Sequence, residues 1–266
     1  MTEMNKSWVL RQRPVGDLKE GDLELVESPL VPLEDGEVRT RLIYLSLDPT
    51  NRIWMSDVDG YLPPVGIGDA MRGGGLAVVT ESRFDGLKEG DIVNTGLGTW
   101  SLYSNLPGSS LNALPRLPGV PLTAYMGPLG ATGMTAYFGL MDIAKPKAGE
   151  TVVVSAAAGA VGSMGGQIAK IQGCRVVGIA GSDEKCKWLT EVAGFDAAIN
   201  YKTEDVGAAL DKHCPKGIDV NFENVGGEIM DTILTRLNDF ARMPLCGLIS
   251  SYNATEPVPG PYNFSL

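Results

Sequence analysis

The chain has 266 residues, of which 44 % are hydrophobic and 20 % charged, and its formal net charge is −10. This composition is typical of a globular protein long enough for two domains, and the acidic balance argues against nucleic-acid or anionic membrane partners. No stretch reaches the roughly 20 apolar residues of a membrane span and residues 1–10 lack the apolar core of a signal peptide, so we expect a cytoplasmic protein.

Residues 1–120 are predicted to be rich in β-strands. Residues 37–47 alternate polar and apolar side chains and stop at Asp48-Pro49, as expected of a half-buried strand. Residues 75–80 and 91–95 are two further short strand candidates, separated by glycine-containing turns. Many short strands with glycine and proline between them favour a barrel-like fold.

Residues 115–121 contain three prolines and are predicted to be a linker. Beyond them, residues 132–141 suggest a helix, and from residue 150 strands and helices alternate. We expect strands at 151–155, 175–180, 197–200, 218–222 and 243–249, and helices at 160–172, 185–192, 204–212 and 228–237. Such alternation predicts a doubly wound parallel sheet over residues 121–266.

A glycine-rich loop follows the first strand of this sheet and opens a helix. It places Ala157, Gly159 and Gly162 in the GxGxxG spacing, with alanine in the first position. Gly159 lets the backbone approach a pyrophosphate, and Gly162 allows close packing of the helix on the strand. Free N–H groups at the helix start bind phosphate oxygens. The loop therefore predicts a dinucleotide site.

The choice between NAD and NADP depends on the end of the second strand. Asp183 stands close to the spacing at which an acid holds the ribose 2′-hydroxyl of NAD. However, Gly181 and Ser182 form a small strand end that leaves room for a 2′-phosphate, and Lys185 follows to neutralise it. These residues alone leave both cofactors open.

The cysteines Cys174, Cys186, Cys214 and Cys246 are far apart, and His213 is the single histidine. A zinc site needs three or four ligands at suitable spacing. We therefore expect free thiols in a reducing compartment and no metal site. A zinc alcohol dehydrogenase is also disfavoured because the first 173 residues contain neither cysteine nor histidine.

Several motifs occur in an order that resembles a known family. They are Leu45-Ser46-Leu47-Asp48-Pro49 with Arg52, Met71-Arg72-Gly73-Gly74-Gly75, Ala156 to Ser163, Ala180 to Lys185, Asn200 to Thr203, Glu223 to Gly227 and Cys246 to Asn253. Together they resemble the zinc-independent medium-chain reductases, which include prostaglandin reductase (leukotriene B4 12-hydroxydehydrogenase), plant 2-alkenal reductases and bacterial curcumin reductase-like enzymes.

The resemblance implies an α/β fold: a GroES-like β-barrel substrate domain at residues 1–120 and a Rossmann NADP-binding domain at 121–266, with the active site in the cleft. It implies NADP(H) as cofactor and reduction of the C=C bond of α,β-unsaturated aldehydes and ketones, with hydride delivered to the β-carbon. It also implies a homodimer when the full-length family chain is present.

The resemblance also assigns site residues. Tyr252 is the implied catalytic proton donor, although a cofactor ribose hydroxyl is an alternative. The implied cofactor-binding residues are Ala160, Val161, Gly162, Ser163, Gly181, Ser182, Lys185, Tyr201, Asn224, Cys246, Gly247, Ile249, Ser250, Ser251 and Tyr252.

Two departures from the family keep other functions open. Thr50 stands where the family often has tyrosine, and Leu266 ends the chain after the fifth predicted strand, which suggests that the Rossmann domain is incomplete at its C-terminus. The alternatives are an NADPH-dependent quinone reductase and a non-catalytic NADPH-binding truncated form.

Overall fold

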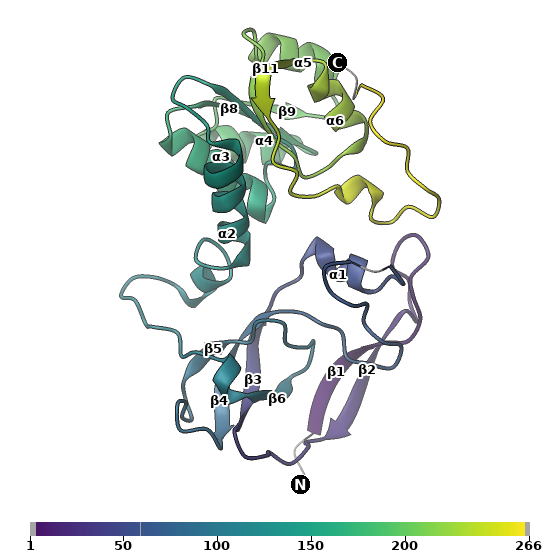
Figure 1. Ribbon diagram of the computed structural model, residues 1–266, viewed down its shortest axis with the longest axis vertical. Coiled ribbons are helices and arrows are strands. Elements are labelled where there is room, and N and C mark those ends of the chain that lie inside the picture. The colour runs from purple at the N-terminus through teal and green to yellow at the C-terminus, as the bar shows by residue number, and fades with distance from the viewer. Residues whose placement is uncertain (1–3, 59, 264–266) are drawn as a thin grey trace. The chain divides into compact units, whose positions relative to one another are not determined.

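The computed structural model describes residues 4–58 and 60–263 (Figure 1). They divide into two units, Met1–Met126 and Gly127–Leu266, each with its own hydrophobic core. Leu266, at which we expect the Rossmann domain to be incomplete, lies outside the described residues.

The first unit is built from antiparallel strands. Its four-stranded sheet has the order β5-β4-β3-β6, and β1 pairs with β2 in a separate hairpin. The predicted strands at 37–47, 75–80 and 91–95 correspond to β3, β4 and β5. The bounds are β1 Met4–Leu10, β2 Leu23–Pro29, β3 Glu37–Leu45, β4 Gly75–Ser82, β5 Ile92–Asn94 and β6 Tyr103–Pro107, with helix α1 at Pro49–Trp54 and 3-10 turns at Gly108–Ser110 and Leu122–Tyr125.

The second unit is a five-stranded parallel sheet in the order β11-β10-β7-β8-β9. The expected α/β fold with a doubly wound sheet is therefore confirmed. The strands are β7 Thr151–Val154, β8 Arg175–Ala180, β9 Ala197–Asn200, β10 Ile218–Phe222 and β11 Leu237–Arg242. The helical segments are α2 Ala131–Phe138, η3 Gly139–Ala144, α3 Ala160–Ile171, α4 Asp183–Glu191, α5 Val206–His213, α6 Gly227–Leu234 and η4 Ile249–Ser251.

Alternation of side chains along the strands builds a core on each face of this sheet. Val152 and Val154 of β7 pack on one face with Leu189 of α4, whereas Val153 packs on the other with Leu210 of α5. All five are fully buried. Burial of each such side chain stabilises the fold by roughly 1.5–3 kcal/mol relative to exposure, so both helix layers are held firmly against the strands.

The position of the fifth strand differs from the prediction. We expected it at 243–249, but β11 spans Leu237–Arg242, and of the predicted segment only Leu245 forms a bridge, to Glu223. Pro244 has no N–H to donate, and the register against β10 shifts between Ile218 and Val220. The prediction of a strand at 243–249 is thus wrong about its position. Residues 243–252 instead form a loop at the carboxyl edge of the sheet.

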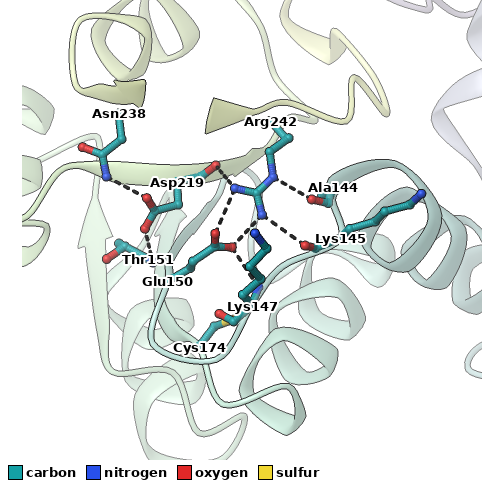
Figure 2. Close-up of polar contacts among 9 residues, drawn as sticks. All are labelled: Ala144, Lys145, Lys147, Glu150, Thr151, Cys174, Asp219, Asn238 and Arg242. Carbon is teal, nitrogen blue, oxygen red and sulfur yellow. Dashed lines mark hydrogen bonds and ion pairs between the residues drawn. The ribbon is translucent and has the colours of Figure 1, made fainter. Parts of the chain in front are cut away.

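A polar cluster at the opposite, amino edge fixes this register (Figure 2). The Arg242 guanidinium donates Nη1 and Nη2 to Glu150 Oε1 and Oε2 at 3.1 and 2.6 Å, and Nε to the Ala144 carbonyl at 2.8 Å. Burial alone would raise the pKa of Glu150, but the hydrogen bonds from Arg242 and from the Lys147 N–H outweigh it and hold that pKa below its ordinary value. The cluster therefore ties β11 to the start of β7.

Within residues 4–58 and 60–263, no helix combines the length and the apolar character needed to cross a bilayer. The same residues contain no group of three or more histidine, cysteine or acidic side chains placed to hold a metal ion.

Candidate cofactor site

The carboxyl ends of β7 and β10 meet at the centre of the sheet. The chain leaves β7 toward β8 on one side, whereas β10 lies on the other, so the strand order reverses between them. In open α/β sheets, ligands bind in the crevice at such a switch point. The loops that follow β7, β8 and β10 therefore define the candidate site.

The loop after β7 depends on close backbone approach. Ala156 has a φ of 48°, an uncommon conformation for a residue other than glycine. The Ala157 N–H donates to the Ile179 carbonyl at 2.9 Å, which holds the loop against β8. A Cβ on Gly162 would lie 2.5 Å from the Ala156 carbonyl oxygen, so glycine is needed there for the helix to begin this close to the strand.

Helix α3 begins with its N-terminus open to a ligand. Ala160, Val161 and Gly162 are its first three residues, and such N–H groups have no acceptor within a helix. No side chain caps this end, and the Ser163 N–H is used by the Gly159 carbonyl at 2.9 Å. The helix dipole adds positive potential at the same point. The loop and helix start thus fit a pyrophosphate.

The end of β8 brings together two residues that are 20 positions apart in sequence. A Cβ on Gly181 would lie 2.9 Å from Tyr201 Cε1 and 3.0 Å from its hydroxyl, so the Tyr201 side chain lies directly over Gly181. Ser182 caps α4, and its Oγ accepts the Lys185 N–H at 3.3 Å. Gly181, Ser182, Lys185 and Tyr201, all predicted cofactor residues, therefore lie at one place.

Lys185 is exposed in the first turn of α4. A cation there opposes the helix dipole, which favours negative charge at an N-terminus. In the part of the chain that the structure describes, its ammonium group forms no ion pair. Its charge is therefore available to an anionic ligand.

Asp183, the acid at the spacing expected for NAD, has a partner of its own. The Asn200 side-chain amide donates Nδ2 to Asp183 Oδ1 at 2.6 Å. Asn200 is buried at the end of β9 and pairs with Ala180 across the sheet. The Asp183 carboxylate is therefore held toward β9.

A buried carboxylate organises the junction of β7 and β10. Glu223 is fully buried, and its Oε1 accepts from Ser155 Oγ at 2.8 Å and from the N–H groups of Val225 and Gly226 at 2.7 and 2.8 Å. Ser155 Oγ in turn accepts the Asn224 N–H at 2.8 Å. Asn224 is thus fixed at the switch point, with its amide bonded to the Ser155 carbonyl at 2.7 Å.

The loop from Cys246 to Tyr252 is bonded along the same junction. The N–H groups of Cys246 and Gly247 donate to the Glu223 carbonyl at 2.9 and 3.2 Å. Those of Ile249 and Ser250 donate to the Asn224 and Val225 carbonyls at 3.2 and 3.0 Å, and Ser251 completes the turn through its bond to the Leu248 carbonyl. The predicted nicotinamide segment is therefore bonded along the residues that follow β10.

The Tyr252 hydroxyl turns back onto this loop. It accepts the Leu248 N–H at 3.2 Å and lies where a Cβ on Gly247 would stand 3.0 Å away. A tyrosine hydroxyl carries one proton and two lone pairs. Because the Leu248 bond occupies a lone pair, the proton stays available for donation.

In the first unit, Thr50 and Arg52 lie on α1. The Thr50 hydroxyl is hydrogen-bonded to the hydroxyl of Tyr61. Arg52 donates to the carbonyls of Pro14 and Gly16 at 3.2 and 3.0 Å, so it anchors a loop of its own unit.

Sequence reasoning assigned no role to Ser155, Asn200 or Glu223. Each is polar, lies at the end of an apolar strand and is almost completely buried. A polar residue at that position must find a partner, and this was the available signal. The partners themselves come from neighbouring strands and were not predictable from spacing.

Comparison with known proteins gives consistent matches along the chain. Family models for the "N-terminal domain of oxidoreductase" and for "Zinc-binding dehydrogenase" match residues 6–114 and 160–264. The NADPH-dependent curcumin reductase of Escherichia coli is 48 % identical over 99 % of this chain and 76 % of its own length. The NADP(+)-dependent 2-alkenal reductase of Nicotiana tabacum is 42 % identical over 95 % of this chain and 75 % of its own.

A solved structure also matches closely. CurA from Vibrio vulnificus in complex with NADPH has a TM-score of 0.88 and 44 % identity, and the match covers 98 % of this chain and 77 % of that one. Both units of the present chain thus have counterparts in a single known fold.

Proposed function

This chain belongs to the medium-chain dehydrogenase/reductase family, in the group of the curcumin and 2-alkenal reductases, and on that premise we propose that it reduces the C=C bond of α,β-unsaturated aldehydes and ketones with NADPH. The observation that carries the proposal is the continuous junction at the carboxyl ends of β7 and β10. Helix α3 begins, with an open N-terminus, five residues after Ser155, whose Oγ accepts the Asn224 N–H. The segment that carries the Tyr252 hydroxyl is bonded to the carbonyls of Glu223, Asn224 and Val225.

The cofactor residues keep the roles that the resemblance implies. Ala160 to Ser163 would contact the pyrophosphate, with the backbone N–H groups of Ala160, Val161 and Gly162 as donors. Ser182, Lys185 and Tyr201 would bind the 2′-phosphate, and Gly181 leaves room for the Tyr201 ring. Asn224 and the segment Cys246 to Tyr252 would line the nicotinamide side. When bound, NADPH supplies the hydride that reaches the substrate β-carbon.

Tyr252 is the proposed proton donor. As the β-carbon is reduced, negative charge develops on the carbonyl oxygen and α-carbon of the substrate, and a nearby donor must stabilise or protonate it. The Leu248 N–H fixes the Tyr252 hydroxyl and leaves its proton free to donate. A ribose hydroxyl of the cofactor remains the alternative donor.

The reaction is tested by following NADPH absorbance at 340 nm with 2-nonenal and, separately, with a quinone. We expect oxidation with the enal and much less with NADH in place of NADPH. Turnover of the quinone alone would favour a quinone reductase. Tight NADPH binding without oxidation of either substrate would reject the proposed reaction for this chain.

The donor role is tested with Tyr252→Phe. A positioned general acid contributes about 10²–10⁴-fold to rate, so kcat should fall by at least about 100-fold while NADPH affinity changes little. Tyr262→Phe, at an exposed tyrosine, is the matched control and should leave kcat unchanged. Unchanged turnover of Tyr252→Phe, with chemistry rate-limiting, would assign proton donation to another group.

We also propose a homodimer and a cytoplasmic location. The outer edge of β11 ends the five-stranded sheet and offers backbone groups for pairing with a second copy. The four cysteines are free thiols, as expected in a reducing compartment. Light scattering of the purified protein and cell fractionation test the two proposals.

A further inference from the structure

We propose that Asn200 sets the preference for NADPH over NADH by holding the Asp183 carboxylate away from the adenosine ribose. This inference rests on the proposed function, because it concerns the cofactor of that reaction. Asn200 itself would contact no part of the cofactor, so it is a positioning residue.

The orientation of the Asn200 side chain is fixed by two neighbours. Its Oδ1 accepts the Lys202 N–H at 3.2 Å, and its Nδ2 donates to Asp183 Oδ1 at 2.6 Å. Its own N–H donates to Glu204 Oε1 at 2.7 Å. Because the Lys202 N–H requires an oxygen on one side, the amide must present its N–H to Asp183 on the other.

The position of Asp183 makes this bond consequential. Asp183 is the first residue of α4, three positions beyond the last residue of β8. In NAD-binding proteins an acid at this end of the sheet accepts the ribose 2′-hydroxyl. The same carboxylate would repel a 2′-phosphate placed near Ser182 and Lys185.

The Asn200 bond weakens both effects. It fixes the carboxylate toward the end of β9 and satisfies one of its oxygens with a charge-assisted hydrogen bond. Asn200 is 4 % exposed and is therefore itself shielded from solvent, whereas Asp183 is exposed. Lys185, free of any ion pair among the described residues, is the cation at this end of β8, in the same turn as the acidic Asp183 and Glu184.

The test is a direct binding titration, followed by cofactor fluorescence, with NADPH and NADH separately. In Asn200→Ala we expect NADPH to bind roughly ten-fold more weakly and NADH several-fold more tightly, a change equivalent to about 1.4 kcal/mol per ten-fold. A ratio of affinities that stays at the wild-type value would overturn the inference.

A second substitution separates positioning from general damage. In an Asp183→Asn background the released side chain carries no charge, so adding Asn200→Ala should leave the NADPH to NADH ratio unchanged. If the ratio shifts equally in both backgrounds, Asn200 acts by a route other than Asp183 and the inference fails.

Two further variants keep the test decisive if Asn200→Ala folds poorly. Asn200→Asp retains the acceptor for the Lys202 N–H but places a carboxylate against Asp183, and Asn200→Asp with Asp183→Asn restores one donor and one acceptor. We expect selectivity to be lost in the first and recovered in the second. Loss in both would contradict the inference.

Asn238→Ala is the matched control. Asn238 donates Nδ2 to Asp219 Oδ1 at 2.7 Å, an equivalent bond at the amino edge of the same sheet (Figure 2). The Asn238→Ala substitution should lower the free energy of unfolding without changing the preference for NADPH over NADH. Binding is measured without turnover, so the two proposals can fail separately. If the ratio of NADPH to NADH affinity shifts in Asn200→Ala but the wild-type protein reduces no enal, only the proposed reaction is rejected. If the wild-type protein is active but the ratio does not shift, only the inference is rejected.

Discussion

Glu223→Ala removes the carboxylate at the centre of the β7–β10 junction. Four donors lose their acceptor: Ser155 Oγ, the N–H groups of Val225 and Gly226, and Asn221 Nδ2, which now donates to Glu223 Oε2 at 2.8 Å. Each donor left unsatisfied in the interior costs roughly 1–3 kcal/mol. Water entering the space would satisfy some of them.

We therefore expect Glu223→Ala to lower the free energy of unfolding by about 3–5 kcal/mol, because four unsatisfied donors would cost roughly 4–12 kcal/mol and water satisfies some of them. That is a large part of the roughly 5–15 kcal/mol by which proteins are stable. NADPH affinity should fall as well, because the same bonds fix the backbone on either side of Asn224.

Glu223→Gln should be much milder. The glutamine oxygen can keep the bonds from Ser155, Val225 and Gly226, and its amide then faces Asn221. Asn221 Oδ1 is buried and has no hydrogen-bond partner among the described residues, so a rotation of the Asn221 amide supplies an acceptor. We expect a cost of about 1 kcal/mol, the value of one ordinary hydrogen bond.

Urea unfolding and NADPH titration of both variants measure these effects, with Glu256→Ala, an exposed carboxylate, as the control. If Glu223→Gln is as damaging as Glu223→Ala, the negative charge itself is required and the count of hydrogen bonds does not explain the site. If Glu223→Ala costs less than about 1 kcal/mol, the junction does not hold the loop.

Three further outcomes are expected. Gly162→Ala should weaken NADPH binding at least about ten-fold, because its Cβ would lie 2.5 Å from the Ala156 carbonyl oxygen and push the start of α3 away; titration that finds unchanged affinity contradicts the fit of this loop. Cys246 is exposed, although partial desolvation raises the pKa of its thiol; alkylation above pH 8 should modify it, and NADPH should protect it if the segment lines the nicotinamide. Burial alone would raise the pKa of Asp196, but hydrogen bonds from Lys170 hold that pKa below its ordinary value. The stability that this pair contributes is present above about pH 4 and is lost as pH falls through the lowered pKa. Asp196→Asn should therefore make the free energy of unfolding depend less on pH in the acid range.

Local sequence was sufficient where an element is set by its own residues. The predicted strand at 175–180 agrees with β8 at both ends, because an apolar run lies between the turn residues Gly173 and Gly181. Ser182, a residue type preferred at the start of a helix, caps α4. The glycine-rich loop was predictable for the same reason, because its characteristic spacing involves residues close together in the sequence.

Elements set by distant partners were harder to predict. The segment 237–242 contains Asn238, Asp239 and Arg242 and has little strand character, whereas 243–249 is apolar. The strand nevertheless forms at 237–242, because Arg242 and Asn238 bond Glu150 and Asp219 at the amino edge of the sheet. The roles of Glu223 and Asn200 were missed for the same reason, since their partners lie on other strands.

Charged side chains at the two edges of the parallel sheet are thus satisfied in different ways. At the amino edge, Arg242 and Glu150 satisfy one another and fix strand register. At the carboxyl edge, the charge of Asp183 is held by Asn200 and that of Glu223 by backbone N–H groups, which leaves Lys185 free. Anionic ligands are attracted by charges that the fold does not use. An NADPH site at the carboxyl edge therefore requires that its carboxylates be occupied internally, so Asn200 and Glu223 belong to the design of the site although neither is proposed to touch the cofactor.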